Sequence, residues 1–163
     1  MATNSQIEWT EATWNPSTGC TKISPGCKNC YAERLSKRLN LMGIAKYKRN
    51  FEYAEHLHDI SLPLTWKKPK KIFVNSMSDL FHEKSTMEFV AECFHTMIKA
   101  DWHTYQVLTK RPKKMEEFSR LFVNYFGYKI PNHIWMGVSV ENSDYKWRIN
   151  ELRKVKCHTK FIS

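Results

Sequence analysis

The residues best suited to chemistry are three cysteines close together in TGCTKISPGCKNCYAER, residues 18–34. Cys20, Cys27 and Cys30 follow the spacing C-x6-C-x2-C. Disulfides join thiols in pairs, so an odd group favours a metal ion or an iron–sulfur cluster. The two-residue gap lets Cys27 and Cys30 approach one metal from a tight turn, and glycine and proline in the longer gap let Cys20 reach the same point.

Two kinds of metal centre suit this spacing. Zinc would take a fourth ligand to complete a tetrahedron, which His56, His58 or His82 could supply. A 4Fe–4S cluster held by three thiolates would leave one iron open to a cofactor or substrate. The remaining cysteines, Cys93 and Cys157, lie in apolar surroundings and are interpreted as packing thiols. The residues alone leave zinc and iron–sulfur open.

Composition limits the class of protein that could carry such a site. The chain has 163 residues, of which 42% are hydrophobic, so we predict a single globular domain over residues 1–163. No apolar run approaches the roughly 20 residues that cross a bilayer, and the first residues lack a signal-peptide pattern. We therefore expect a cytoplasmic protein without membrane contact, whose thiols stay reduced.

The charge distribution points to a polyanionic partner. The net charge is +10, and the stretch from Lys22 to Lys71 holds 12 basic and 4 acidic residues. Such an excess favours nucleic acid, or it offsets the charge of an anionic cluster and cofactor. Aromatic and basic residues alternate in residues 46–53 and 65–71, a composition that suits base stacking and phosphate contact.

The hydrophobic pattern predicts alternating strands and helices, typical of a parallel sheet with helical crossovers. Residues 112–125 are expected to form a helix that turns Met115, Phe118, Leu121 and Phe122 inward. Residues 44–70 are expected to form a basic, irregular insertion. The expected strands lie near Trp14 and at 72–77, 104–110, 133–140 and 159–163, and the expected helices at 30–41, 86–100, 112–125 and 143–154.

Polar residues follow each of these strands. In parallel βα folds the ligand lies at the carboxyl ends of the strands, so these residues and the cysteines are predicted to share one site. Taken singly, Asp79 and Asn142 also suit the caps of turns or helices. The polar residues are Ser76, Ser78, Asp79 and His82 after the second strand, Lys110 and Arg111 after the third, and Glu141 and Asn142 after the fourth.

Four blocks, TGCTKISPGCKNCYAERL, KKIFVNSMSDLFHE, QVLTKRP and MGVSVEN, resemble a phage- and prophage-associated family of uncharacterised radical-SAM-like proteins. That family is distantly similar to the spore photoproduct lyase group. The resemblance runs from Ile7 to Ser163. It implies a partial parallel (βα) barrel of about four to five βα units, truncated at its C-terminus because such proteins continue with a further strand. A partner protein would then cover the open edge of the barrel.

The resemblance also implies a cofactor and a reaction. It implies a 4Fe–4S cluster on Cys20, Cys27 and Cys30, with S-adenosylmethionine chelating the open iron. One electron would release a 5′-deoxyadenosyl radical, which abstracts hydrogen from an unknown substrate, for which nucleic acid is a candidate. By position, it places Ser76, Ser78 and Asp79 near the methionyl amine, Ser139, Glu141 and Asn142 near the ribose, and Lys110 and Arg111 near the carboxylate or a substrate phosphate.

The cysteine spacing departs from the usual radical SAM motif, C-x3-C-x2-C, because the first gap here is six residues. An alternative therefore stays open, in which the chain is a zinc-stapled, non-catalytic protein that binds nucleic acid. Whether the protein is an enzyme is left undecided by the sequence, which marks no residue as catalytic.

Overall fold

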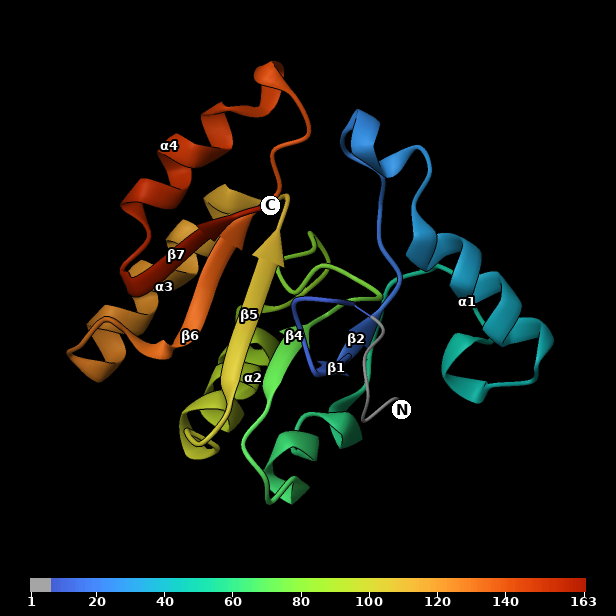
Figure 1. Ribbon diagram of the computed structural model, residues 1–163, viewed down its shortest axis with the longest axis horizontal. Helices are drawn as coiled ribbons and strands as arrows, with labels where there is room; N and C mark the ends of the chain where they lie inside the picture. Colours follow the sequence, from blue (N-terminus) through green and yellow to red (C-terminus); the bar gives the residue numbers. More distant parts are fainter. Residues whose placement is uncertain (1–6) are drawn as a thin grey trace.

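The computed structural model describes residues 7–163 and has a mixed α/β fold (Figure 1). The strands are β1 (Ala12–Trp14), β2 (Ser17–Thr18), β3 (Ala54–Glu55), β4 (Lys71–Val74), β5 (Thr104–Thr109), β6 (Ile130–Val138) and β7 (Cys157–Ile162). The helices are α1 (Tyr31–Leu41), α2 (Met87–Lys99), α3 (Pro112–Phe126) and α4 (Trp147–Lys154). Short 3-10 turns occupy Pro25–Cys27, Ala45–Tyr47, Leu57–Asp59, Leu62–Thr65 and Ser143–Tyr145.

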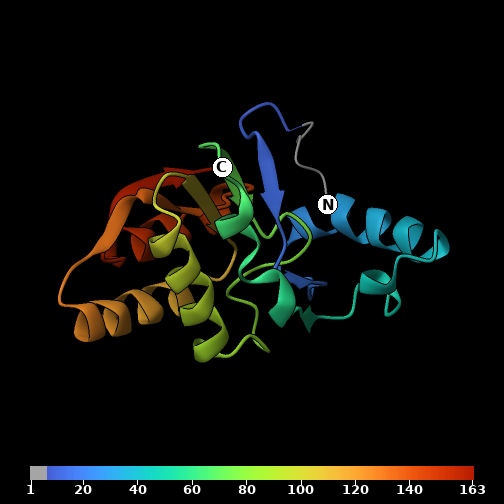
Figure 2. The ribbon, with the colours of Figure 1, turned by 90° about the horizontal axis from the view of Figure 1, so that it is seen from below.

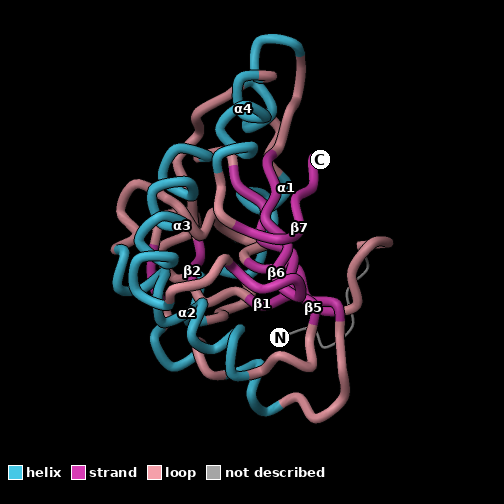
Figure 3. Tube along the Cα trace, turned by 90° about the vertical axis from the view of Figure 1, so that its left-hand side faces the viewer, coloured by secondary structure: helices cyan, strands magenta, loops and turns pink. Residues whose placement is uncertain are grey.

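Five strands form one parallel sheet in the order β1-β4-β5-β6-β7. This confirms the predicted parallel sheet with helical crossovers. Helices α2, α3 and α4 connect successive strands from β4 to β7 and lie together on one face of the sheet (Figure 3), as expected of crossovers that share one hand. Helix α1 lies apart from these three, to the side of the sheet (Figures 1 and 2). No helix within residues 7–163 is both long and apolar enough to traverse a bilayer.

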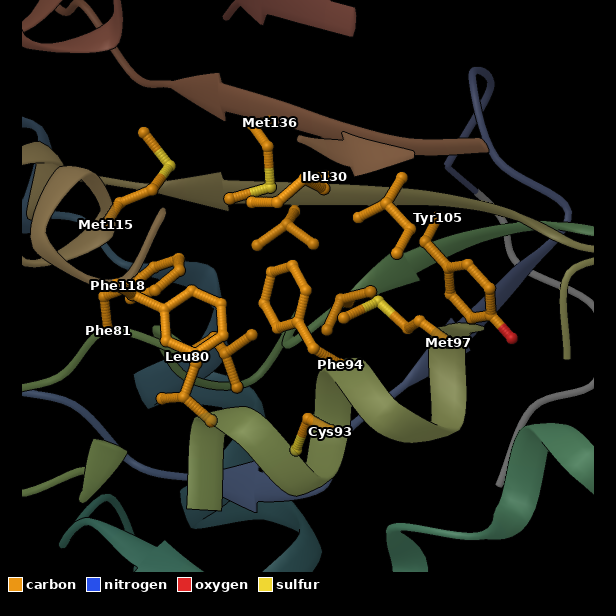
Figure 4. Packing of buried hydrophobic residues seen from close by; sticks show 14 of the residues in the cluster. Leu80, Phe81, Cys93, Phe94, Met97, Tyr105, Met115, Phe118, Ile130 and Met136 are labelled. Atoms are coloured by element: carbon orange, nitrogen blue, oxygen red, sulfur yellow. The ribbon is translucent and has the colours of Figure 1, made fainter. Parts of the chain in front are cut away.

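The main core fills the space between the sheet and helices α2 and α3. Phe94 of α2 and Phe118 of α3 pack with ring centroids 4.5 Å apart (Figure 4). Burying each such side chain contributes about 1.5–3 kcal/mol. Cys93 and Cys157 belong to this buried cluster, as expected of packing thiols. Leu121 is half exposed, so its predicted inward position was wrong.

Several boundaries differ from the sequence-based expectation for local reasons. β4 ends at Val74 rather than Met77, because Asn75 adopts a left-handed conformation with φ 59° that leaves the extended region. The segment 44–70 is more ordered than expected. It contains β3, which pairs antiparallel with β2, and three 3-10 turns. The helix expected at 143–154 is divided into a 3-10 turn and α4.

Candidate functional site

A pocket of about 300 Å³ lies where the cysteine segment meets the carboxyl ends of β4, β5 and β6. The arrows of β5 and β6 point toward the end of the molecule where this segment lies (Figure 1). All three clustered cysteines line the pocket. Ser139 lines it too, so the structure brings together residues as far as 119 positions apart in the sequence. The predicted site residues on its wall are Cys20, Cys27, Cys30, Ser76, Ser78, Asp79, Lys110, Arg111 and Ser139.

Gly19 fixes the start of the cysteine segment. Its φ is +80°, and a Cβ at this position would collide with the backbone carbonyl of Glu52. The Gly19 amide donates to the carbonyl of Met77 at 2.9 Å, and the Cys20 amide donates to the carbonyl of Phe51 at 3.1 Å. Only glycine permits this close approach at low cost, so Gly19 determines where Cys20 enters the pocket.

Two cations approach two of the thiols. The Arg111 Nη1 lies 3.5 Å from the Cys20 Sγ, and the Lys110 Nζ lies 3.6 Å from the Cys27 Sγ. Burial raises the pKa of Cys20 to about 11, although Arg111 opposes the shift. Burial also acts to raise the pKa of Cys27, but hydrogen bonds from the Ile23 backbone and from Ser24, together with Lys110, outweigh it and lower this pKa. The pKa of Cys20 is therefore raised and that of Cys27 lowered, although both thiols line the same pocket.

Asp79 and Arg111 form a buried ion pair at the centre of the strand ends. Their N–O distance is 3.1 Å, and each side chain is 8% exposed. Asp79 also accepts from the Thr109 hydroxyl at 2.7 Å, and from the amides of Lys110 and Phe81 at 3.0 Å each. These contacts engage both of its carboxylate oxygens. Asp79 therefore joins the ends of β4 and β5, and its side chain is not free to receive a ligand.

The two serines after β4 are likewise engaged with the chain. The Ser76 hydroxyl donates to the Asn15 Oδ1 at 3.2 Å, and the Ser78 hydroxyl donates to the Ser17 carbonyl at 3.0 Å. Ser76 also accepts through its carbonyl from the Tyr31 hydroxyl. These bonds connect the segment after β4 to Asn15, which follows β1, and to Ser17 of β2.

Asn75 is a pocket residue that the sequence reasoning missed. It is buried, its Nδ2 donates to the Ser17 hydroxyl at 3.0 Å, and its Oδ1 has no partner within the described part of the chain. A buried acceptor without a partner is costly, so a ligand that donates an N–H or O–H to Asn75 would be favoured. The available signal was an asparagine directly after a buried strand, where its tolerance of the left-handed region allows a turn.

Glu141 and Asn142 lie outside the pocket wall. Glu141 bridges Lys110 at 2.7 Å and Arg148 at 2.8 Å, and it accepts from the Ser24 hydroxyl at 2.5 Å. It thus connects the segment after β6 to the cysteine segment through Ser24, to the end of β5 through Lys110 and to α4 through Arg148. Asn142 accepts from the Asp144 amide at 2.9 Å and caps the following turn, the second of the two roles considered for it.

The candidate histidine ligands do not line the pocket. The His56 ring bonds to the Thr18 hydroxyl at 2.8 Å, and the His58 ring is exposed. The His82 Nδ1 accepts from the Lys84 amide at 3.2 Å, and its Nε2 bonds to the Thr21 hydroxyl at 2.9 Å. Across residues 7–163, no three His, Cys, Asp or Glu side chains stand close enough to hold an ion together. Joint binding by the three thiols thus requires the cysteine segment to draw them closer.

Comparison with known proteins gives a family. The model of a family described as "Protein of unknown function (DUF5131)" matches residues 4–163. The chain belongs to this family. Searches of curated proteins and of solved structures give no match. The DUF5131 description names no activity.

Proposed function

We propose that this DUF5131 protein binds a 4Fe–4S cluster through Cys20, Cys27 and Cys30 and acts as a radical SAM enzyme. The observation that carries the proposal is that these three thiols line one pocket at the carboxyl ends of parallel strands. With the cluster and S-adenosylmethionine bound, one electron from an external donor would cleave the sulfonium C–S bond, giving methionine and a 5′-deoxyadenosyl radical that takes a hydrogen atom from the substrate.

The chemistry of the pocket walls fits this group. Three thiolates that held a cluster would carry negative charge, and Lys110 and Arg111 approach two of the sulfurs closely enough to offset it. The cysteines are half-buried, which shields a cluster from water while leaving the pocket side open. The volume of about 300 Å³ lies within the range of small-molecule sites.

The pocket residues that we assign to the amine of the ligand differ from those that the sequence predicted. Asn75 Oδ1 has no hydrogen-bond partner among residues 7–163, so we assign it to an amine donor on the ligand in place of Ser76, Ser78 and Asp79. Those three residues support the strand ends. Lys110 and Arg111 offer positive charge to sulfur and to an anionic ligand group alike.

The sheet supports the finer proposal of a partial (βα) barrel. Its strands follow chain order, and α2, α3 and α4 lie on one face (Figure 3). Phe73, Gln106 and Trp135 are paired across β4, β5 and β6, so they point to the same face. Phe73 also lines the pocket. We assign this second face to the approach of substrate, and a partner protein would cover the open edge at β7.

Cleavage of S-adenosylmethionine tests the proposed reaction. Protein reconstituted with iron and sulfide without oxygen, then given dithionite and S-adenosylmethionine, should produce 5′-deoxyadenosine, measured by mass spectrometry. Cys27→Ala should produce none, whereas Cys93→Ala should match the wild type because Cys93 lies in the core. A wild-type protein with a full cluster that neither binds nor cleaves S-adenosylmethionine would contradict the radical reaction.

A further inference from the structure

A second pocket, of about 380 Å³, lies beside the first, between the starts of α3 and α4. Lys110 and Arg111 line both pockets, so the two sites are neighbours. Five of the side chains on the wall of this second pocket are cationic and one is acidic, Glu83. The cations are Lys110, Arg111, Lys113, Lys114 and Arg148.

Two aromatic rings in this pocket carry cations against their faces. The Trp147 ring is partly exposed at 41%, and the Lys113 Nζ lies 5.8 Å from its centroid. The Arg148 guanidinium lies 4.4 Å from the centroid of Tyr145. Exposed aromatic planes beside cations are the elements with which proteins stack nucleobases and contact the adjoining phosphates.

The start of α3 adds backbone donors to the same wall. The helix begins at Pro112, which has no amide N–H, its first turn has no acidic residue, and no side chain among residues 7–163 caps it. The first amides of a helix have no partner within it, and its dipole makes this end positive. An anion near Lys113 would therefore meet both backbone N–H groups and positive charge.

Arg148 provides an independent sign that a ligand belongs here. Its side chain is 1% exposed, and its Nη1 donates to the Ser139 carbonyl at 2.9 Å and to Glu141 at 2.8 Å. Arg148 lines this pocket, and its Nε has no hydrogen-bond partner among the described residues. A buried charged donor left unpaired is costly, and an acceptor oxygen of a ligand would satisfy it.

We propose that the second pocket binds one nucleotide of a single-stranded nucleic acid, with the base on Trp147 and a phosphate at the start of α3. The proposal rests on the proposed function in one respect: it supplies the substrate class, because the neighbouring nucleotide would lie at the first pocket across Lys110 and Arg111. A single strand is required because stacking on Trp147 needs a base released from a duplex. The site differs from residues 22–71, of which only Ile23 lines the pocket.

Binding of labelled oligonucleotides tests this site. Fluorescence anisotropy with fluorescein-labelled oligo(dT) and oligo(rU) of about 15 nucleotides would be measured with and without a reconstituted cluster. Trp147→Leu combined with Lys113→Gln should weaken binding about tenfold or more, and Lys113→Gln alone should reduce the salt dependence of affinity by about one ion. A preference for one of the two oligonucleotides would show whether DNA or RNA is bound.

The matched control carries the same changes at the other end of the sheet. Trp102→Leu combined with Lys99→Gln should leave affinity unchanged, because Lys99 ends α2 and Trp102 lies between α2 and β5, at the amino end of that strand. Thermal unfolding of each variant verifies the fold.

Three results would overturn the proposal: equal affinity of the pocket variant and the wild type, tighter binding of a duplex than of either strand, or loss of binding only when Lys67, Lys68, Lys70 and Lys71 become Gln. Iron content distinguishes the two proposals, since Cys27→Ala should lose iron while keeping the oligonucleotide affinity of the metal-free protein.

Discussion

At the scale of single residues, cysteine side chains have different surroundings in different parts of the fold. Cys20 is held by the Gly19 turn and faces Arg111, whereas Cys27 faces Lys110 and Ser24. Cys93 has the same side chain and lies in the core between α2 and the sheet. Position in the fold, rather than residue type, separates the proposed ligands from the packing thiol.

This separation predicts opposite effects of two alanine substitutions. Cys27→Ala should reduce bound iron to near zero, because two thiolates cannot hold the cluster that three would hold. Cys93→Ala should keep its iron and lose about 1 kcal/mol of unfolding free energy from the vacated core volume. Iron analysis and urea unfolding measure the two effects. Equal iron loss in both variants would refute the ligand assignment.

The buried pair of Asp79 and Arg111 predicts a stability effect that its exposed neighbour lacks. Asp79→Ala should lower the free energy of unfolding by about 3 kcal/mol or more, because it removes the buried carboxylate that pairs with Arg111 and accepts from the Thr109 hydroxyl and the Lys110 amide. Glu83→Gln should cost under about 1 kcal/mol, because the Glu83 side chain is 58% exposed although it also contacts Arg111. Urea unfolding measures both, and similar losses would show that Asp79 does not brace the strand ends.

At the scale of elements, the pattern of apolar residues was sufficient to predict the main helices and the strands of the sheet. α2 is an example, since Val90, Phe94 and Met97 recur at helical spacing and all three are buried. The short ribbon of β2 and β3 could not be predicted, because two-residue strands are too short to show an alternation. Their pairing depends on contacts between residues 36 and 38 positions apart, which no local pattern records.

The β2–β3 ribbon predicts a pH dependence of stability. Burial, with help from the charge of Lys46, lowers the pKa of His56 to about 4, whereas the ordinary histidine value is 6.5. The unfolded chain therefore binds a proton that the folded chain does not, so the free energy of unfolding should fall as the pH drops from about 6.5 to about 4.

His56→Gln should make this dependence shallower, because glutamine does not titrate. Urea unfolding at several pH values measures the slope. His95→Gln, on the exposed side of α2, is the control and should leave the slope as in the wild type. An identical slope in wild type and His56→Gln would show that His56 is not the group responsible.

At the scale of the whole molecule, the convergence of the site followed from topology. Carboxyl ends of parallel strands meet at one edge, so the sequence could place Lys110 near the cysteines. It could not predict which polar groups the chain itself uses. Neighbouring strands engage Asp79 and Ser78, whereas the Asn75 Oδ1 has no partner in the described part of the chain. These outcomes depend on the packing of three strand ends.

The charge of the molecule illustrates a similar limit. Composition alone predicted nucleic-acid contact at residues 22–71, where most of the excess positive charge lies. The structure gathers Lys113, from the basic run KRPKK at residues 110–114, with Trp147 and Arg148 of another helix, and no sequence pattern links the two segments. A site assembled from separate elements becomes visible only once the helices are placed beside one another.

The most direct test of the central proposal is the iron and sulfide content of protein purified without oxygen, with its visible absorption spectrum. We expect about four irons and four sulfides per chain and a broad visible band that a reductant bleaches. One zinc per chain with no colour would contradict the iron–sulfur proposal and favour the zinc-stapled alternative.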